Sequence, residues 1–327
     1  MLICSVVIER WPLTHPFGTA REVIEDVPMI VVKLTDRHGR VGRGEALGVD
    51  YDGETPASMR EQVLGARAQF DDDLNGERLA VLLSLGGARN AVDCALWDLR
   101  AKQTGIPVWK AIGLAPLKPV PTVYTIGLAD PETTRQKIRE ARRYPMLKLK
   151  LDSTRHLDVI RMAREQHPEA RLIVDANEAW TRPELETLLP GMVAAGIELI
   201  EQPLRRGTDM ALDGFTSPIP LAADESCTNR ASLKALRGRY QYVNIKLDKT
   251  GGLTEALAVA AEATRMGFGL MVGNMGGTSL AMAPAFLIGQ SCRYADLDGA
   301  LLLAKDREHP MLFEDGALLP PSPLLWG

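Results

Sequence analysis

The chain has 327 residues, 46% of them apolar and 24% charged, with a formal net charge of -4. This balance is typical of a globular protein, and the length predicts one large domain or two ordinary ones. Lys and Arg form no stripe that would follow phosphates, so we expect neither nucleic acid nor an anionic membrane as a partner. No apolar stretch approaches the length of a membrane span, and the first eleven residues lack a signal-peptide pattern. We therefore expect a cytoplasmic protein, whose four scattered cysteines fit no zinc motif and serve as small buried residues.

The first 115 residues predict a mixed α+β module. Three segments have strand patterns and two have helical patterns; the strands are Ile3–Glu9, Pro28–Thr35 and Arg40–Ala46, and the helices are Thr55–Asp71 and Ala88–Thr104. Nothing in this module looks catalytic. The C-terminal tail, residues 305–327, is rich in proline, and we expect it to pack back on the module.

From Val120 onward, short apolar runs alternate with helical segments, and their starts lie roughly 22 to 27 residues apart. The runs are Thr122–Ile126, Leu147–Leu151, Arg171–Val174, Glu198–Ile200, Pro220–Ala223, Tyr242–Leu247, Gly269–Val272 and Tyr294–Leu297. Near-continuous apolar strands between helices indicate a parallel sheet that is buried on both faces. Eight such units over residues 116–304 predict a closed TIM-type (β/α) barrel, in preference to an open doubly wound sheet.

Three carboxylates follow three consecutive strands of this barrel. They are Asp175, Glu201 and Asp224, one strand–helix unit apart, and barrel active sites lie at this end of the strands. Each acid alone could simply cap the next helix, but capping does not require the same strand-end position three times. Three gathered carboxylates repel one another unless a cation is bound, and oxygen ligands favour Mg²⁺, with Mn²⁺ as a substitute. None of the five histidines ends a strand, which disfavours zinc.

Lysines end two further strands. Lys148 and Lys150 share one face of the second strand, and Lys246 ends the sixth. A strand lysine is usually a solvated edge residue, but a closed barrel has no solvated edge. The second and sixth of eight strands lie opposite each other, so the lysines are predicted to flank the three carboxylates from both sides.

This arrangement fits removal of a proton from the carbon beside a substrate carboxylate. A nearby cation lowers the pKa of an amine towards the range of a general base. Mg²⁺ on the substrate carboxylate would stabilise the enediolate that forms. With a lysine on each face, one can take the proton and the other can return one, which inverts the carbon.

These residues resemble the enolase superfamily, in its muconate-lactonizing-enzyme subgroup. The resemblance rests on KxK in the second strand, the DAN, EQP and ADES contexts of the three acids, and KLDKTGG in the sixth strand. The helix from Ala91 to Lys102, leading to Gly105-Ile106-Pro107, is similar to that subgroup's signature in its capping domain. The resemblance covers nearly the whole chain and implies a modified, (β/α)7β-like barrel under an N-terminal α+β capping domain.

The resemblance also implies roles for individual residues. Lys150 and Lys246 would be the acid/base pair, Asp175, Glu201 and Asp224 the Mg²⁺ ligands, and Lys148 a neighbour that tunes Lys150 or touches the substrate carboxylate. The residues that would orient these groups are Asn177, Gln202, Glu225 and Asp248.

The eighth strand narrows the substrate. Asp296 and Asp298 share one strand face, and two more acids suit a cation in the substrate. A DxD here looks like the dipeptide epimerases (L-Ala-D/L-Glu epimerase-like), where it holds the N-terminal ammonium; the alternative is a helix cap or a surface pair. Family members whose dipeptide has an acidic second residue carry an arginine that receives its side-chain carboxylate. The corresponding position here is Ile24, and the nearest arginine is Arg21. A hydrophobic or mixed dipeptide is therefore as plausible as an acidic one.

The expected protein is a Mg²⁺-dependent dipeptide epimerase that acts on a small molecule, and a homo-oligomer is compatible with the sequence. Three alternatives stay open at this point. The same site could perform o-succinylbenzoate synthesis or muconate-type cycloisomerisation. One lysine could instead form a Schiff base in a metal-free lyase, or the barrel could only bind its ligand.

Overall fold

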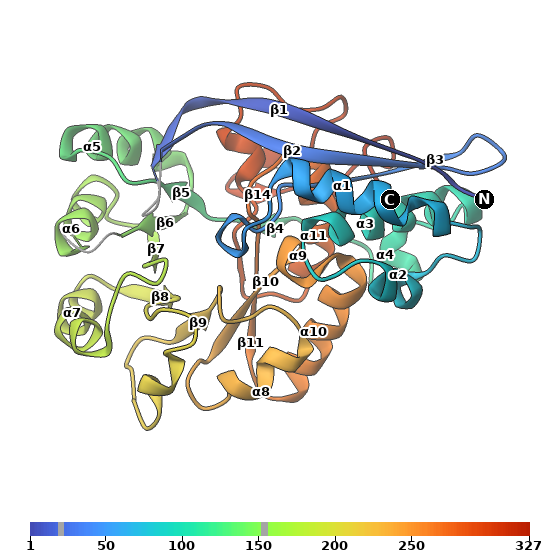
Figure 1. Cartoon of the computed structure of the whole chain (residues 1–327). Helices are drawn as coiled ribbons and strands as arrows, with labels where there is room; N and C mark the ends of the chain where they lie inside the picture. The colour runs from blue at the N-terminus through green and yellow to red at the C-terminus, as the bar shows by residue number, and fades with distance from the viewer. Residues whose placement is uncertain (19–22, 152–155) are drawn as a thin grey trace.

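The computed structural model describes residues 1–18, 23–151 and 156–327 (Figure 1). The chain begins with an antiparallel sheet in the order β1 (Ile3–Gly18), β2 (Val23–Thr35), β3 (Val41–Ala46). Four helices follow it: α1 (Pro56–Ala66), α2 (Gly76–Leu82), α3 (Gly87–Thr104) and α4 (Val108–Ala111). All five predicted elements are present, whereas the short helices α2 and α4 were not predicted. We refer to this sheet and its helices as the cap.

The cap holds together through close contact between β3 and α3. A Cβ atom at Gly44 would lie 2.1 Å from the carbonyl oxygen of Ala91, and one at Gly42 would lie 2.1 Å from that of Ala95. Only glycine therefore lets the strand approach the helix backbone this closely. Around this contact, alternate apolar residues of β2 pack with buried residues of α1 and α3 into a core separate from that of the barrel.

Strands β1 and β2 extend well beyond their predicted ends. Prolines at positions 12 and 16 argue against a continuous strand, but β1 accommodates them with a register shift between Pro12 and Phe17. The resulting long hairpin arches over the barrel (Figure 1). Its described end contacts the barrel where Leu128 N donates to Gly18 O at 2.8 Å. This hairpin brings residues of the cap to the mouth of the barrel.

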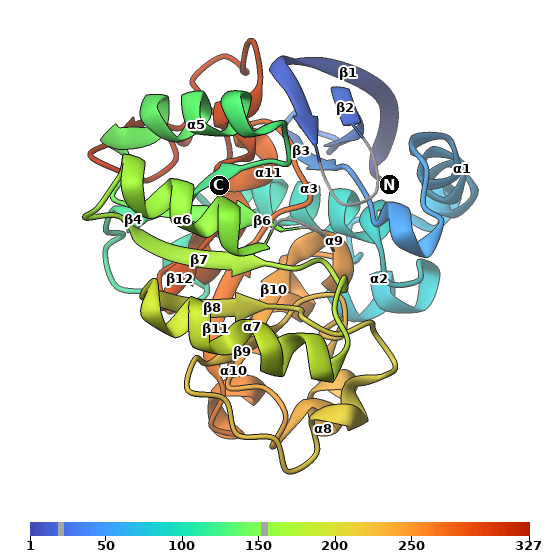
Figure 2. The same ribbon diagram turned by 90° about the vertical axis from the view of Figure 1, so that its left-hand side faces the viewer.

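The second part of the chain is the predicted parallel barrel. Eight strands are joined in chain order: β5 (Tyr124–Ile126), β6 (Met146–Lys150), β7 (Arg171–Asp175), β8 (Ile197–Glu201), β9 (Leu221–Ala223), β10 (Tyr242–Lys246), β11 (Gly269–Gly273) and β12 (Tyr294–Ala295). The first and last strands approach each other through a hydrogen bond of 2.9 Å from Val123 N to Ala295 O. Figure 2 shows the curled sheet with its helices outside. The fold class is therefore confirmed.

Helices cover the outside of the barrel: α5 (Pro131–Glu140), α6 (His156–Gln166), α7 (Arg182–Ala194), α8 (Leu233–Leu236), α10 (Leu253–Arg265) and α11 (Ser279–Gly289). After β12 the chain continues as a 3₁₀ turn, Gly299–Leu302, which agrees with a (β/α)7β-like barrel. Within the described residues, no helix is both long and apolar enough to span a bilayer.

The tail contacts both the barrel and the cap. It forms a small hairpin of β13 (Phe313–Glu314) and β14 (Ala317–Leu318), which pairs with β4 (Val120–Pro121). Its end then packs on α3, where Trp326 Nε1 donates to Cys94 O at 3.0 Å. The division at residues 115 and 305 stays a prediction, because the tail contacts both the barrel and the cap.

One carboxylate of α3 holds the start of a barrel helix. Asp93 accepts hydrogen bonds from Thr254 N at 2.9 Å and Thr254 Oγ1 at 2.6 Å, in the first turn of α10. Gly252, just before this helix, has φ +115°, and a Cβ there would lie 2.5 Å from the Asp93 side chain. Asp93 therefore caps α10 across the two parts of the chain.

We expect Asp93→Ala to lower the free energy of unfolding by about 1–2 kcal/mol, because two donors of the α10 terminus lose their acceptor. The loss is limited because burial raises the pKa of Asp93 to about 6, so the native carboxylate already bears a desolvation cost. Thermal melting measures the change. Asp93→Asn keeps one acceptor oxygen and should lose less; equal losses for the two variants would contradict the capping role.

Candidate active site

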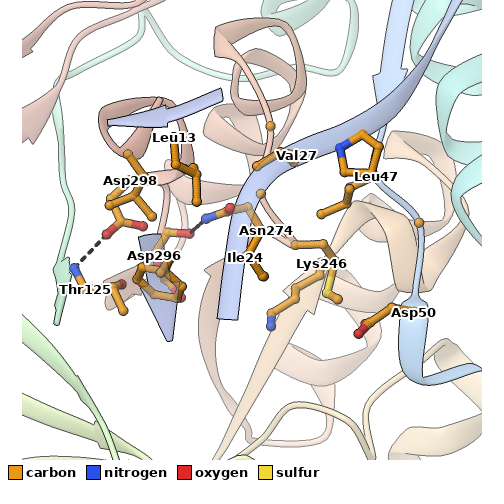
Figure 3. A pocket seen from close by; sticks show the side chains of 18 of the residues that line it. Leu13, Ile24, Val27, Leu47, Asp50, Thr125, Lys246, Asn274, Asp296 and Asp298 are labelled. Carbon is orange, nitrogen blue, oxygen red and sulfur yellow. Dashed lines mark hydrogen bonds between the residues drawn. The ribbon is translucent and has the colours of Figure 1, made fainter. Parts of the chain in front are cut away.

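A pocket of about 560 Å³ lies between the barrel mouth and the cap hairpin. The cap contributes Leu13, Ile24, Val27, Leu47 and Asp50, and the barrel contributes Thr125, Lys246, Asn274, Asp296 and Asp298 (Figure 3). The pocket thus has a largely apolar wall from the cap and a charged wall from the strand ends. A small molecule in it would be enclosed by both parts of the chain.

The three predicted carboxylates lie together at the barrel mouth and are almost fully buried. Asp175 ends β7 and Glu201 ends β8, and the two are direct neighbours in the strand register. Asp224 follows β9 immediately. Lys148 Nζ lies 3.0 Å from Asp175 Oδ2 and 2.8 Å from Glu201 Oε2, so one ammonium group joins two of the acids.

Lys150 and Lys246 reach the pocket from opposite sides, because their strands, β6 and β10, are four strands apart in an eight-stranded barrel. Lys150 Nζ donates to Asp175 Oδ2 at 2.6 Å and to Asn177 Oδ1 at 2.9 Å. Lys246 Nζ donates to Asp224 Oδ2 at 2.6 Å. Each lysine is therefore held by a carboxylate at the edge of the same pocket.

The pKa of Lys246 is raised: burial lowers it, but the carboxylates, Asp224 foremost, outweigh burial. A general base near neutral pH needs the opposite shift. A divalent cation among these carboxylates would supply it, because positive charge nearby favours the neutral amine.

A further lysine was missed from the sequence. Lys249 is buried in the turn α9 (Leu247–Thr250) and donates to both Asp224 Oδ1 and Asp224 O, and to Asn244 O at 3.0 Å. These contacts use all three ammonium protons, and Lys249 does not line the pocket. Its place three residues after Lys246 is the only signal in the sequence, and it does not reveal that the side chain turns back towards β9.

Asp296 and Asp298 face the pocket next to each other, after β12. Lys148 Nζ lies 2.6 Å from Asp296 Oδ2, and Thr125 N donates to Asp298 Oδ2 at 2.7 Å (Figure 3). Burial, followed by the charge of Asp296, raises the pKa of Asp298 to about 8. A cationic group of a ligand would relieve this crowding. Asn274, which was not among the predicted site residues, supports the pair by donating to Asp296 O at 2.6 Å.

The four residues predicted to orient the metal ligands and lysines lie at different distances from the pocket. Asn177 and Glu225 line the pocket, and Asn177 Nδ2 lies 3.4 Å from Glu225 Oε1. Gln202 is fully buried behind the carboxylates. Asp248 lies outside the pocket and accepts a hydrogen bond of 2.8 Å from Gly48 N, a pocket residue of the cap. Asp248 thus fixes a cap loop against the barrel.

Two hairpin residues, Ile24 and Arg21, were predicted to contact the substrate, and the structure describes one of them. Ile24 pairs with Phe17 in the β1–β2 register, and both line the pocket. Arg21 lies outside the described residues. The cap also contributes acidic residues to the pocket lining. One of them, Asp26, forms an ion pair with Arg10 at 2.8 Å.

Known families match both parts of the chain. Residues 2–113 match the mandelate racemase / muconate lactonizing enzyme N-terminal domain, and residues 132–323 match the enolase C-terminal domain-like family. The chain belongs to the enolase superfamily. The predicted resemblance is therefore confirmed across nearly the whole length.

Its relatives within the superfamily are named epimerases and racemases. An L-Ala-D/L-Glu epimerase of Escherichia coli is 41% identical and aligns over 97% of this chain and 99% of its own. An N-acetyl-D-glutamate racemase of Pseudoalteromonas is 40% identical and aligns over 91% of this chain and 95% of its own. This enolase-superfamily member is accordingly an isomerase that acts on a small molecule.

Solved structures agree with this result. An enolase family member from Agrobacterium tumefaciens, described with bound sodium and L-Ala-L-Glu, is 40% identical, with a TM-score of 0.97 and full coverage of both chains. A dipeptide epimerase from Methylococcus capsulatus, complexed with Mg and L-Arg-D-Lys, is 30% identical, with a TM-score of 0.89 over 99% and 98% of the chains. Relatives thus take dipeptides with quite different side chains.

The chemistry of the three carboxylates fits a hard divalent cation. Glu201 Oε2 is buried, and its one close charged neighbour among the described residues is the Lys148 ammonium at 2.8 Å. Burial, followed by the charge of Asp175, raises the pKa of Glu201 to about 8. Within residues 1–18, 23–151 and 156–327, no three acidic, imidazole or thiol groups surround one point, and the Lys148 ammonium lies among the carboxylates. The donor set therefore fits Mg²⁺, but its binding requires these side chains to rearrange.

Proposed function

We propose that this protein is a Mg²⁺-dependent dipeptide epimerase that inverts the α-carbon of the C-terminal residue. The observation that carries the proposal is the placement of Lys150 and Lys246 on opposite sides of one pocket, with the three carboxylates between their strands. A substrate α-carbon held between two such groups can lose a proton to one face and gain one from the other.

The two lysines act as a matched pair, one neutral and one charged at the start of each turnover. The neutral amine takes the α-proton; the C–H bond breaks, its electron pair moves into the carboxylate as an enediolate, and an N–H bond forms. The ammonium group on the other face then gives a proton to the α-carbon. The product has the opposite configuration, and the lysines have exchanged their charge states. Asn177, which accepts from Lys150 at 2.9 Å, helps to aim that side chain.

The other charged groups hold the two ends of the dipeptide. Lys148, Asp296 and Asp298 all line the pocket. In the proposal Lys148 lies beside the substrate carboxylate, and the two acids accept the N-terminal ammonium. Asp175, Glu201 and Asp224 would hold Mg²⁺, for which Mn²⁺ can substitute. When bound, Mg²⁺ supplies positive charge that stabilises the carboxylate as negative charge builds on it.

The test is deuterium incorporation at the α-carbon in D₂O with Mg²⁺, followed by mass spectrometry over a broad library of L,L-dipeptides. We expect incorporation at the C-terminal residue of one group of dipeptides. The library includes acidic, hydrophobic and basic second residues, because Ile24 lines the pocket at the position where the resemblance implies an arginine in relatives that take an acidic residue. Lack of exchange in every dipeptide would refute the proposal.

Three other activities are tested alongside the dipeptides. N-acetylated amino acids belong in the library because of the N-acetyl-D-glutamate racemase relative, although an acylated nitrogen gives Asp296 and Asp298 no ammonium to bind. The o-succinylbenzoate synthase and muconate cycloisomerase reactions also lack an amine. Turnover of one of these substrates, with dipeptides inert, would assign that reaction to the pocket instead.

A further inference from the structure

A buried hydrogen-bond network lies behind the carboxylates and outside the pocket. It consists of Gln202, Ser226, Tyr240 and Asp209, none of which lines the pocket. Three of these residues, Asp209, Ser226 and Tyr240, lie in segments between strands and were not among the predicted site residues. The network is connected to the carboxylates through Gln202.

Gln202 joins three strand ends at one point. Its backbone N donates to Ala222 O in β9 at 2.8 Å, and its carbonyl accepts from Glu178 N, beyond β7, at 2.9 Å. Its side-chain Oε1 accepts from Asp224 N at 2.8 Å and from Ser226 N at 3.1 Å. Gln202 itself follows Glu201 and has φ +32°, a backbone conformation that residues with side chains rarely adopt. Such strain persists where surrounding contacts hold it in place.

The network fixes which way the Gln202 amide points. Asp209 Oδ1 accepts from Tyr240 OH at 2.6 Å and from Ser226 Oγ at 2.8 Å. Each hydroxyl has a single proton, so its oxygen is left to accept from Gln202 Nε2, at 3.2 Å for Tyr240 and 3.1 Å for Ser226. Gln202 Nε2 also donates to Leu204 O at 2.8 Å. The network and this carbonyl together hold the amide NH₂ away from Asp224, and the amide oxygen faces the backbone N–H of Asp224 and Ser226.

We infer that Asp209 and Tyr240 are positioning residues, which set the orientation of Gln202 and through it the placement of Asp224 relative to Glu201. The inference rests on the proposed role of these two carboxylates as Mg²⁺ ligands. The Asp209 side chain accepts from both hydroxyl groups of the network, and these hydroxyl oxygens face the Gln202 amide, whose oxygen accepts from the backbone that carries Asp224. Groups that orient metal ligands in this way typically affect metal affinity 10–100-fold.

The test is the Mg²⁺ dissociation constant of purified variants by isothermal titration calorimetry. Tyr240→Phe and Asp209→Ala remove the orienting groups, and we expect each to raise the dissociation constant by about 10–100-fold. At saturating Mg²⁺, KM for a dipeptide should stay within about threefold, because neither residue lines the pocket. Asp209→Asn keeps an acceptor oxygen and should restore most of the affinity.

Leu212→Ala is the matched control, since Leu212 is fully buried in the same 3₁₀ turn as Asp209 and takes no part in the network. It should lower the melting temperature without changing the Mg²⁺ dissociation constant. If Asp209→Ala does not fold, Tyr240→Phe and Ser226→Ala serve the test. Folded variants that bind Mg²⁺ as the wild type does would overturn this inference alone. A wild-type protein that binds no Mg²⁺ would overturn the proposed metal site and the inference with it.

Discussion

Replacing Lys150 or Lys246 by alanine is expected to lower kcat/KM for epimerisation by about 10²–10⁴-fold, the range that one positioned acid or base contributes. Inversion needs a group on each face of the α-carbon, so the loss of either lysine slows the full reaction. Because the two lysines belong to strands on opposite sides of the barrel, neither can replace the other.

The exchange reaction should separate the two roles. Each single variant keeps one lysine and should still exchange the α-proton of one of the two epimers in D₂O. The Lys150 variant and the Lys246 variant should act on different epimers. Proton NMR of an L,L-dipeptide and its L,D-epimer, each followed separately, measures this. Lys234→Ala, at an exposed lysine of α8, is the control and should behave as the wild type. Exchange of both epimers by a variant that keeps only one of the two lysines would contradict the two-base assignment.

Removing the metal, or a carboxylate proposed to hold it, should slow proton exchange about as much as the loss of one lysine slows epimerisation. Without a cation, proton removal beside a carboxylate creates a second negative charge among buried acids, and a bound metal is worth several kcal/mol of such stabilisation. We therefore expect EDTA treatment, Glu201→Gln or Asp224→Asn to lower the deuterium-exchange rate by roughly 10²–10⁴-fold. Added Mg²⁺ should restore the EDTA-treated wild type but not the variants.

Glu198→Gln is the matched control for Glu201. Both residues lie in β8, but Glu198 is partly exposed and pairs with Arg171 at 2.7 Å. Its loss should change stability slightly and leave exchange unaffected. Full activity in EDTA, with a substrate adduct trapped on a lysine by borohydride, would favour Schiff-base chemistry over the proposed mechanism.

The barrel could be predicted from the sequence because each strand carries its own signal. A short apolar run buried on both faces, followed by charged residues, recurs with the spacing of a strand–helix unit. For the same reason the candidate site could be predicted: Asp175 and Glu201 end consecutive strands and Asp224 directly follows the next, so local patterns place them at one end of the barrel. The observed ends of the barrel strands differ from the predicted ends by at most two residues, as Tyr242–Lys246 in place of Tyr242–Leu247 illustrates.

Features that depend on contacts between distant segments were not predictable. The hairpin continues past Pro12 because a register shift absorbs the interruption, and only the folded pairing shows this. Lys249 reads as an ordinary helix residue until its side chain is seen to reach Asp224. Asp209 and Tyr240 are far apart in sequence, and only loop packing brings them to Gln202. Such contacts are fixed by tertiary structure, which strand and helix periodicity does not encode.

The central claim is that Lys150 and Lys246 exchange the α-proton of the C-terminal residue with inversion. A dipeptide substrate labelled with deuterium at the C-terminal α-carbon, and another labelled at the N-terminal α-carbon, test this directly in H₂O. We predict complete loss of label from the C-terminal position, accompanied by conversion to the epimer, and full retention at the N-terminal position. Turnover with the C-terminal deuterium retained would contradict the account.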